Sequence, residues 1–373
     1  MSQDDVDEFS EPIGAVPIIP EVSEATWHAL FQAAEAVHRI QPWKVLVDGD
    51  LFAMHHPDSN DVSLGSVLGH GQKVSGVQLY RMPEGIRFWN DTFKTGKPNY
   101  SQLQLHNHML DAEFQAKGRL DPEDHRVRDQ LGLPKLPNKG RPYPLFRSMR
   151  PEAMPWFLDE DEARLLTLAL RLSLIQAEYF TEQGGGEKVD YPKDEGGIMK
   201  IPTYRLKAGG DAMAIEDWER SEEAMPQAPP EEEAATSIPE EGLIARLEGL
   251  PTGDATWQIA SLNMPMPGLS EGRMRYPRVV LTVDSQSGGI VDYLMDKPTQ
   301  DAGEHYRRAF AEAAEKAKAL PKALHVNGPV GKNVFSELAE TLKIELKIRL
   351  TMDEWVAGAN LLVEKVTEGI SKA

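Results

Sequence analysis

Residues 257–262 read WQIASL, residues 278–283 read RVVLTV and residues 289–295 read GIVDYLM. Each run is short, rich in apolar and β-branched residues, and bounded by residues that favour turns, which is the pattern of a strand. The second and third runs are joined by DSQSG, a polar loop that ends in glycine and is typical of a hairpin. These runs therefore predict a three-stranded antiparallel meander.

Helices and strands alternate after the meander. Their predicted bounds are a helix over 301–320, a strand over 323–326, a helix over 332–342, a strand over 344–350 and a helix over 353–368. Because a strand that follows a helix in this way runs parallel to its neighbour, the pattern predicts an α/β domain. We place this domain at residues 251–373.

This order of elements resembles the ribonuclease H-like fold, and the sequence is similar to retroviral-integrase and transposase cores. WQIA at 257–260 resembles their first strand, VDS at 283–285 their second-strand turn, and HVNG at 325–328 the strand that carries their second acid. The resemblance implies a site in which two or three carboxylates hold divalent metal ions.

The carboxylates that this chemistry requires are largely absent from the chain. Ala260 stands where the first acid of those enzymes would be, and Val326 or Asn327 stands where the second would be. Asp284 and Glu364 remain as weak candidate metal ligands. Asp284 is more simply explained as a turn residue, and Glu364 as a solvent-facing helix residue. We therefore expect the fold to persist without the nuclease activity.

The first half of the chain has the pattern of an α+β domain, which we place at residues 21–210 after a flexible tail at residues 1–20. Ser23 is expected to cap a first helix that ends at Pro42. The other predicted elements are strands over 45–54, 62–68, 74–80 and 198–206, and helices over 84–93, 102–117, 121–130 and 159–179. The three consecutive strands predict an antiparallel meander.

An acidic stretch, residues 211–250, separates the two predicted domains. It is rich in alanine and proline and contains the run Glu231-Glu232-Glu233. Like charges repel one another, and a segment of this composition buries little apolar surface. We expect a solvated linker.

The block FRSMRPEAMPWFL at residues 146–158 precedes an acidic helix start, and we expect it to form a loop against that helix. Together with Trp27 and Pro42-Trp43, it resembles a two-domain family of uncharacterised bacterial and archaeal proteins, built from domains of unknown function. The resemblance implies relatives but no reaction. Glu152-Ala153 departs from the family pattern, which has a Gly-Tyr pair at this point.

Arginines in and beside this block alternate with aromatic residues. Planar guanidinium groups suit carboxylate and phosphate ligands, so Arg147, Arg150 and Trp156, with Arg141 nearby, are the candidate ligand-binding residues. The structural alternative is that Arg147 pairs with the acids at 159–162 and that Trp156 is buried in the core.

Two further clusters suggest a metal or acid–base site. His106, His108 and Asp111 include metal-ligating residue types, but in a helix over 102–117 the two histidines point about 200° apart. His108 and Asp111 share a face of that helix, so we expect a hydrogen-bonded surface pair between these two. In the run Asp48-Gly49-Asp50 the glycine favours a turn over a carboxylate pair on a strand.

Composition excludes several classes of function. The net charge of −19 and the isoelectric point near 5.0 repel polyphosphates, so a nucleic-acid partner is not expected. The chain contains no apolar run of about 18 to 20 residues, so we expect no membrane span and a cytoplasmic protein. The absence of cysteine excludes disulfides, thiolate nucleophiles and zinc–thiolate sites.

These observations favour a non-catalytic binding or interaction module that has a protein partner and no cofactor. One alternative is a metal-dependent nuclease or phosphoryl-transfer enzyme of the ribonuclease H-like class, using Asp284 and Glu364. The other is a sensor of small anions built on Arg147, Arg150 and Trp156.

Overall fold

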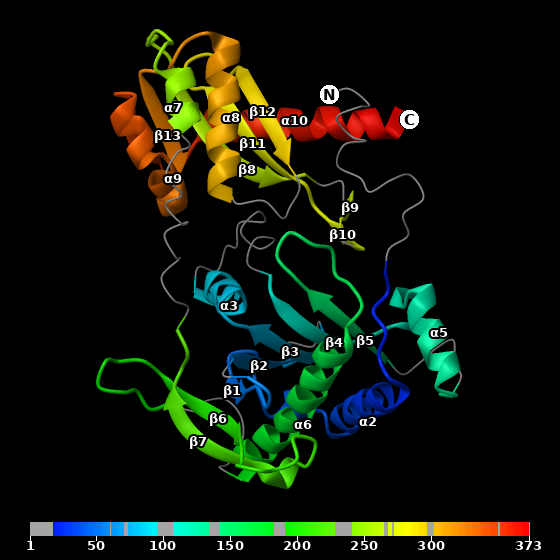
Figure 1. The fold of residues 1–373 in the computed structure, drawn as a ribbon. Coiled ribbons are helices and arrows are strands. Elements are labelled where there is room, and N and C mark those ends of the chain that lie inside the picture. Colours follow the sequence, from blue (N-terminus) through cyan, green and yellow to red (C-terminus); the bar gives the residue numbers. More distant parts are fainter. Residues whose placement is uncertain are drawn as a thin grey trace. The chain divides into compact units, whose positions relative to one another are not determined.

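The computed structural model describes residues 18–59, 61–70, 74–94, 107–134, 142–182, 191–227, 241–264, 268–270, 272–296, 302–349 and 351–372. The chain divides into two compact units. One comprises Ile18–Pro151 with Pro155–Ala228, and the other contains Glu152–Met154 and Pro229–Ala373. Each unit combines helices with a sheet (Figure 1).

The N-terminal unit is built on a seven-stranded sheet with the order β5-β4-β3-β2-β1-β6-β7. The strands are β1 (Phe52–His55), β2 (Val62–Leu68), β3 (Gly76–Arg81), β4 (Met109–Gln115), β5 (Tyr143–Met149), β6 (Lys200–Leu206) and β7 (Trp218–Ala224). Neighbouring strands are antiparallel except β1 and β6, which are parallel. The sheet therefore contains the predicted meander and extends beyond it on both sides.

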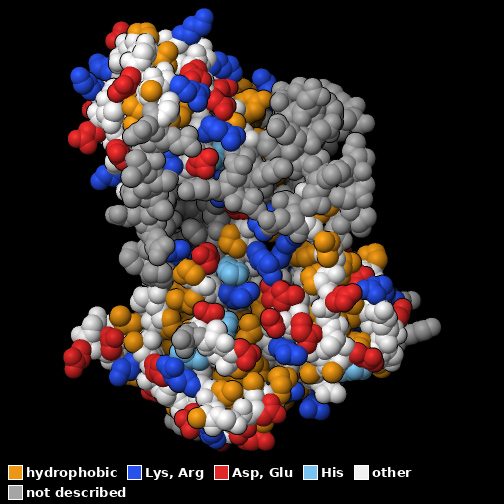
Figure 2. Space-filling view, in the orientation of Figure 1, with side chains coloured by type: hydrophobic (Ala, Val, Ile, Leu, Met, Phe, Trp, Pro, Cys, Tyr) orange, Lys and Arg blue, Asp and Glu red, His pale blue; other side chains and the backbone are white. Residues whose placement is uncertain are grey.

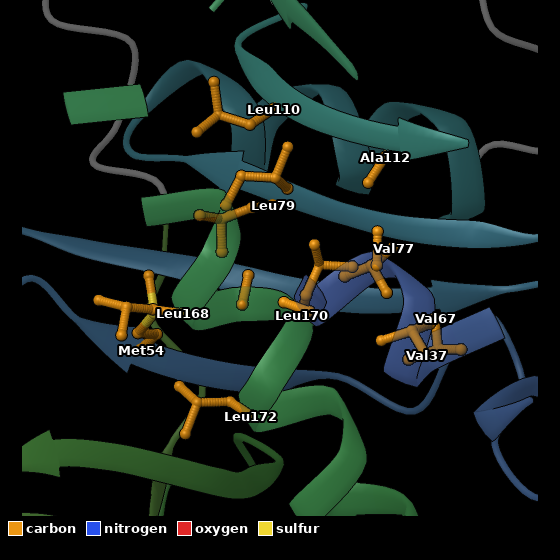
Figure 3. Close-up of a cluster of buried hydrophobic side chains, with 14 of the residues drawn as sticks. Val37, Met54, Val67, Val77, Leu79, Leu110, Ala112, Leu168, Leu170 and Leu172 are labelled. Atoms are coloured by element: carbon orange, nitrogen blue, oxygen red, sulfur yellow. The ribbon is translucent and has the colours of Figure 1, made fainter. Parts of the chain in front are cut away.

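Helices α2 (Glu24–Ile40) and α6 (Glu160–Glu182) pack against one face of this sheet. Ser23 caps α2, because its side chain accepts a hydrogen bond from the backbone N–H of Thr26. Helix α6 is buried on all sides over residues 166–170, as expected of a helix that is apolar all round. Figure 3 shows leucines of α6 in one apolar cluster with Val37 of α2 and residues of β1 to β4.

The opposite face of the sheet carries a second, smaller apolar cluster. Tyr80, Met109 and Ile201 of three strands pack there with Ile86 and Trp89 of α3 (Glu84–Lys94). Another helix of the unit, α5 (Pro122–Gln130), begins at a capping box formed by Asp121 and Asp124. In Figure 2 acidic and basic side chains are interspersed over this unit.

Three predictions for the N-terminal half were wrong. The described part of 102–117 contains strand β4, in which Leu110 and Ala112 face the helices while Asp111 faces the other way, so its period is two and not 3.6. Residues 42–44 form a short 3₁₀ helix, so the strand expected over 45–54 begins only at Phe52. The block 146–158, expected to be a loop, begins within strand β5.

Ordered structure occupies both ends of the stretch expected as a linker. Strand β7, at 218–224, pairs with β6 of the N-terminal unit, and helix α7 (Glu241–Leu247) contributes Leu243 and Leu247 to the core of the other unit. The run Glu231-Glu232-Glu233 and the expected tail up to residue 17 lie outside the described residues.

The C-terminal unit is built on a five-stranded sheet with the order β12-β11-β8-β13-β14. The strands are β8 (Thr256–Asn263), β11 (Arg278–Asp284), β12 (Ile290–Asp296), β13 (Ala323–Asn327) and β14 (Glu345–Arg349), and a separate short hairpin joins β9 (Gly268–Ser270) to β10 (Arg273–Arg275). Strands β8, β11 and β12 are antiparallel, whereas β13 and β14 lie parallel to β8. The predicted meander and the alternation after it are confirmed.

Helices cover both faces of this sheet. Apolar residues of α8 (Ala302–Ala317) and α9 (Gly328–Thr341) form one core with Trp257, Ile259 and Val326. Helix α10 (Asp353–Lys372) packs on the other face, where Gly358 lies so close to Val283 of β11 that a Cβ would approach its Cγ2 to 2.9 Å. Among the described residues, no helix is both long and apolar enough to cross a membrane.

Candidate functional site

Arg147 is almost completely buried at the β5 edge of the N-terminal sheet and is bound by carboxylates of α5. Its Nη1 and Nη2 donate to Asp124 Oδ1 and Oδ2 at 2.9 and 2.8 Å, and Nη2 also donates to Asp121 Oδ2 at 2.5 Å. Its guanidinium carbon lies 4.8 Å from the ring centre of Phe157. Burial by itself lowers the pKa of Arg147, but the two aspartates outweigh it and raise that pKa.

The prediction that Arg147 pairs with the acids at 159–162 was therefore wrong. Arg150 makes that contact: its Nη2 donates to Glu162 Oε1 at 2.8 Å and to Asp159 Oδ2 at 3.1 Å. The Oγ of Ser148 donates to the same Glu162 oxygen at 2.8 Å, and Arg81 lies 3.5 Å from it.

Glu162 is the buried centre of this second network. Burial by itself raises its pKa, but the charge and hydrogen bonds of Arg150, with the hydrogen bond from Ser148, outweigh burial and lower that pKa. The carboxylate is therefore ionised at neutral pH. Glu162 and Asp159 together balance the charges of Arg81 and Arg150, so a ligand anion would have to displace a protein carboxylate in order to bind there.

Arg147 and Arg150 thus belong to different networks, one with the carboxylates at the start of α5 and one with those at the start of α6. Trp156 is half-buried, less than the structural alternative required. Its Nε1 donates to the backbone oxygen of Ile18 at 3.0 Å, and its backbone pairs with that of Ser148. Arg141 lies outside the described residues.

His108 lies beside the Glu162 network, which the sequence did not indicate. Its Nδ1 lies 3.4 Å from Glu84 Oε2. Burial, together with the charge of Arg81, lowers the pKa of His108, so its imidazole is neutral at neutral pH. His108 precedes β4 rather than lying on a helix with Asp111, so the predicted surface pair was wrong, and His106 lies outside the described residues.

Asp48 and Asp50 lie in a turn, as predicted. Asp50 Oδ2 accepts a hydrogen bond from the backbone N–H of Val47 at 2.8 Å, and its Oδ1 accepts one from Tyr191 at 3.1 Å. Within the part of the chain that the structure describes, no three His, Asp or Glu side chains are grouped so that they could hold a metal ion.

In the C-terminal unit, the weak metal candidates Asp284 and Glu364 lie in a turn and on an exposed helix face, as their structural explanations predicted. Asp284 ends β11, and its Oδ1 accepts hydrogen bonds from the backbone N–H groups of Gln286 and Ser287 and from the Ser287 hydroxyl. Glu364 is exposed on α10. Each side chain therefore has a structural explanation that requires no metal.

The position of the first missing acid lies under helix α10. Ala260 of β8 is 4% exposed. Two residues earlier on the same face of β8, Gln258 Nε2 donates to Glu354 Oε2 at 2.6 Å, and Gln258 Oε1 accepts the backbone N–H of Trp355 at 2.9 Å. One amide side chain therefore fastens the start of α10 to the centre of the sheet.

Comparison with known protein families finds two matches. Residues 27–198 match the domain of unknown function DUF7309, and residues 243–354 match the domain of unknown function DUF6930. No curated protein matches the chain. The resemblance to a family with two such domains is confirmed: in this chain a match to DUF7309 is followed by a match to DUF6930.

Proposed function

We propose that this protein acts by binding a partner rather than by catalysis, and that its DUF6930 domain is a ribonuclease H-like scaffold without the catalytic acids. The proposed fold is supported by the strand order. The antiparallel strands β12, β11 and β8 are followed by β13 and β14, added in parallel beside β8. This is the order that the resemblance to integrase and transposase cores implies.

The contact that carries the proposal is the bridge from Gln258 to the start of α10. Metal-dependent phosphoryl transfer requires carboxylates that converge on metal ions at this part of the sheet. Here Ala260 is a buried apolar residue on the α10 face of β8, Val326 of β13 packs in the core on the opposite face, and the Gln258 side chain bonds to Glu354 and to the N–H of Trp355. The side chains in this region therefore hold the helix in place and supply no pair of acids.

The charge of the chain also favours a partner that is not a nucleic acid. A net charge of −19 repels a polyphosphate at long range, so a nucleic-acid ligand would have to be bound against that field. We infer a protein partner.

A cleavage assay tests the proposal. The purified full-length chain is incubated with single- and double-stranded DNA and RNA in Mg²⁺ or Mn²⁺, and we expect no cleavage above that of a buffer blank. The matched variants are Asp284→Ala, at the retained acid, and Asp129→Ala, at an exposed acid of α5. Cleavage that Asp284→Ala abolishes and Asp129→Ala leaves intact would show that the domain is an enzyme.

A further inference from the structure

A cavity of about 480 Å³ lies in the N-terminal unit between the start of α2 and helix α5. This volume is within the range of sites that bind small molecules. Val22 and Trp27 line it from the α2 side, Val127 lines it from α5, and Phe157 lines it from the block that precedes α6. The walls are thus partly aromatic, and they come from segments far apart in the sequence.

Carboxylates dominate the charge of the lining. Glu21, Glu24 and Glu123 line the cavity, together with one cation, Arg126. Arg126 Nε donates to Glu123 Oε2 at 2.7 Å, so this pair is neutral as a whole. The exposed carboxylates of Glu21 and Glu24, the second of which lies 3.6 Å from His28 Nε2, give the mouth of the cavity a negative potential.

The aromatic walls are held in place and suit a positive charge. The Trp27 ring lies 6.0 Å from the ring of Phe31 and 6.2 Å from that of Phe146, measured between ring centres. Phe157 already has the guanidinium of Arg147 over its ring. The faces of aromatic rings attract cations, and they do so more strongly where water is excluded.

We propose that this cavity binds a small organic cation, with its apolar body against Trp27 and Phe157 and its ammonium or guanidinium group facing Glu21 and Glu24. An inorganic ion would leave the aromatic walls unused, and an anion would meet the two carboxylates. The ligand site lies in the N-terminal unit and does not depend on the function proposed for the DUF6930 domain.

Titration calorimetry of the full-length chain with phenethylammonium as the probe tests this site. We expect saturable binding at low salt, weaker binding at 0.5 M salt because screening acts on exposed carboxylates, and much weaker binding of the uncharged analogue 2-phenylethanol. If phenethylammonium shows no saturable binding up to millimolar concentrations, or if 2-phenylethanol binds equally well, the proposal is overturned.

Charge-removing variants locate the site. Glu21→Gln combined with Glu24→Gln should weaken phenethylammonium binding about tenfold, the effect of two carboxylates near a cation in a largely aqueous setting. Both positions are exposed, so the fold should be unaffected, which circular dichroism checks. The matched control is Glu178→Gln, an exposed acid on α6 in the lining of a different cavity. Equal loss in the control, or no loss in the double variant, overturns the assignment.

Discussion

Asp159 and Glu162 hold the start of helix α6 through two reciprocal hydrogen bonds. The backbone N–H of Asp159 donates to Glu162 Oε2 at 3.2 Å, and the backbone N–H of Glu162 donates to Asp159 Oδ1 at 2.9 Å. This is a capping box. Because the other oxygen of Glu162 accepts from Ser148 and Arg150, a single carboxylate joins the helix start to the end of strand β5.

Glu162→Gln should destabilise the DUF7309 domain by about 2 kcal/mol at pH 7, less than the roughly 3–5 kcal/mol of a fully buried pair, because Arg150 is 39% exposed. The pKa of Glu162 is lowered in the folded state, so its contribution is present above the pKa of the unfolded chain and is lost as pH falls through the folded pKa. Chemical denaturation from pH 7 down to about pH 3 should show a shallower acid loss in the variant. A slope equal to that of the parent would contradict this account.

Arg147→Ala should destabilise the same domain by about 3 kcal/mol, because it removes the cation that pairs with the mostly buried carboxylate of Asp124. Trp156→Ala should cost less than the roughly 3–5 kcal/mol of a buried aromatic, since the side chain is only half-buried. Calorimetry of the full-length chain measures both. Arg164→Ala is the control, because its pair with Glu160 is exposed and should change stability by less than about 1 kcal/mol.

Asp111→Asn should stabilise the DUF7309 domain at pH 7 by about 1–3 kcal/mol, the usual cost of an unfavourably buried polar group. Burial, followed by the charge and hydrogen bond of Glu113, raises the pKa of Asp111 well above its ordinary value, although Gln78 and Arg147 oppose this. A carboxyl group whose pKa is raised by folding stabilises the fold while the pH is below its unfolded pKa. This contribution is lost as the pH rises through the folded pKa. The gain should therefore shrink near pH 4.

Denaturant midpoints of the parent and Asp111→Asn at the two pH values check this prediction. Asp129→Asn, at an exposed position of α5, is the matched control and should leave the midpoint unchanged at both. A destabilising Asp111→Asn would mean that the ionised carboxylate is the form that the fold requires.

Ala260→Asp should destabilise the DUF6930 domain by more than about 2 kcal/mol and should not create nuclease activity. The new carboxylate would lie under α10 at a position that is 4% exposed, without a partner acid on β13. Urea unfolding and the DNA cleavage assay measure the two outcomes. Ala260→Ser, which adds only a hydroxyl, is the milder comparison. A stable variant that cleaves DNA with Mn²⁺ would show that the site needs one acid to be restored.

The C-terminal fold was predictable because the residue pattern of each segment favours the same helix or strand that the tertiary structure contains. The runs that begin at Trp257, Arg278 and Ile290 are apolar strands separated by turn residues, and the predicted helices after them were observed with small shifts at their ends. Strands β8 and β11 lie inside the sheet and bury consecutive residues on both faces, so apolar residues dominate their sequences.

Strands β4 and β7 escaped prediction for opposite reasons. The region of β4 contains enough apolar residues at helical spacing to imitate a helix, and only pairing with β3 and β5 selects the strand. Strand β7 has the sequence WERSEEA, with Trp218 as its one buried residue, because it lies at the edge of the sheet and exposes most of its side chains.

The candidate residues were predicted in part. Arg147 and Arg150 were identified from their residue types, but their partners were assigned wrongly. Asp121 is 26 residues from Arg147, and Arg81 is 81 residues from Glu162. Contacts over such separations depend on which strands are neighbours, and one sequence without that pairing does not determine them.

The parallel pairing of β1 with β6 has a consequence for how the domain is made. The family match ends at residue 198, two residues before β6 begins, and β1 has no neighbour on that side until β6 arrives. During synthesis the nascent chain therefore presents an unpaired strand edge while about 150 further residues are added. A fragment that ends at residue 198 lacks β6, so the edge of β1 would stay unpaired. Such a fragment should self-associate through this edge.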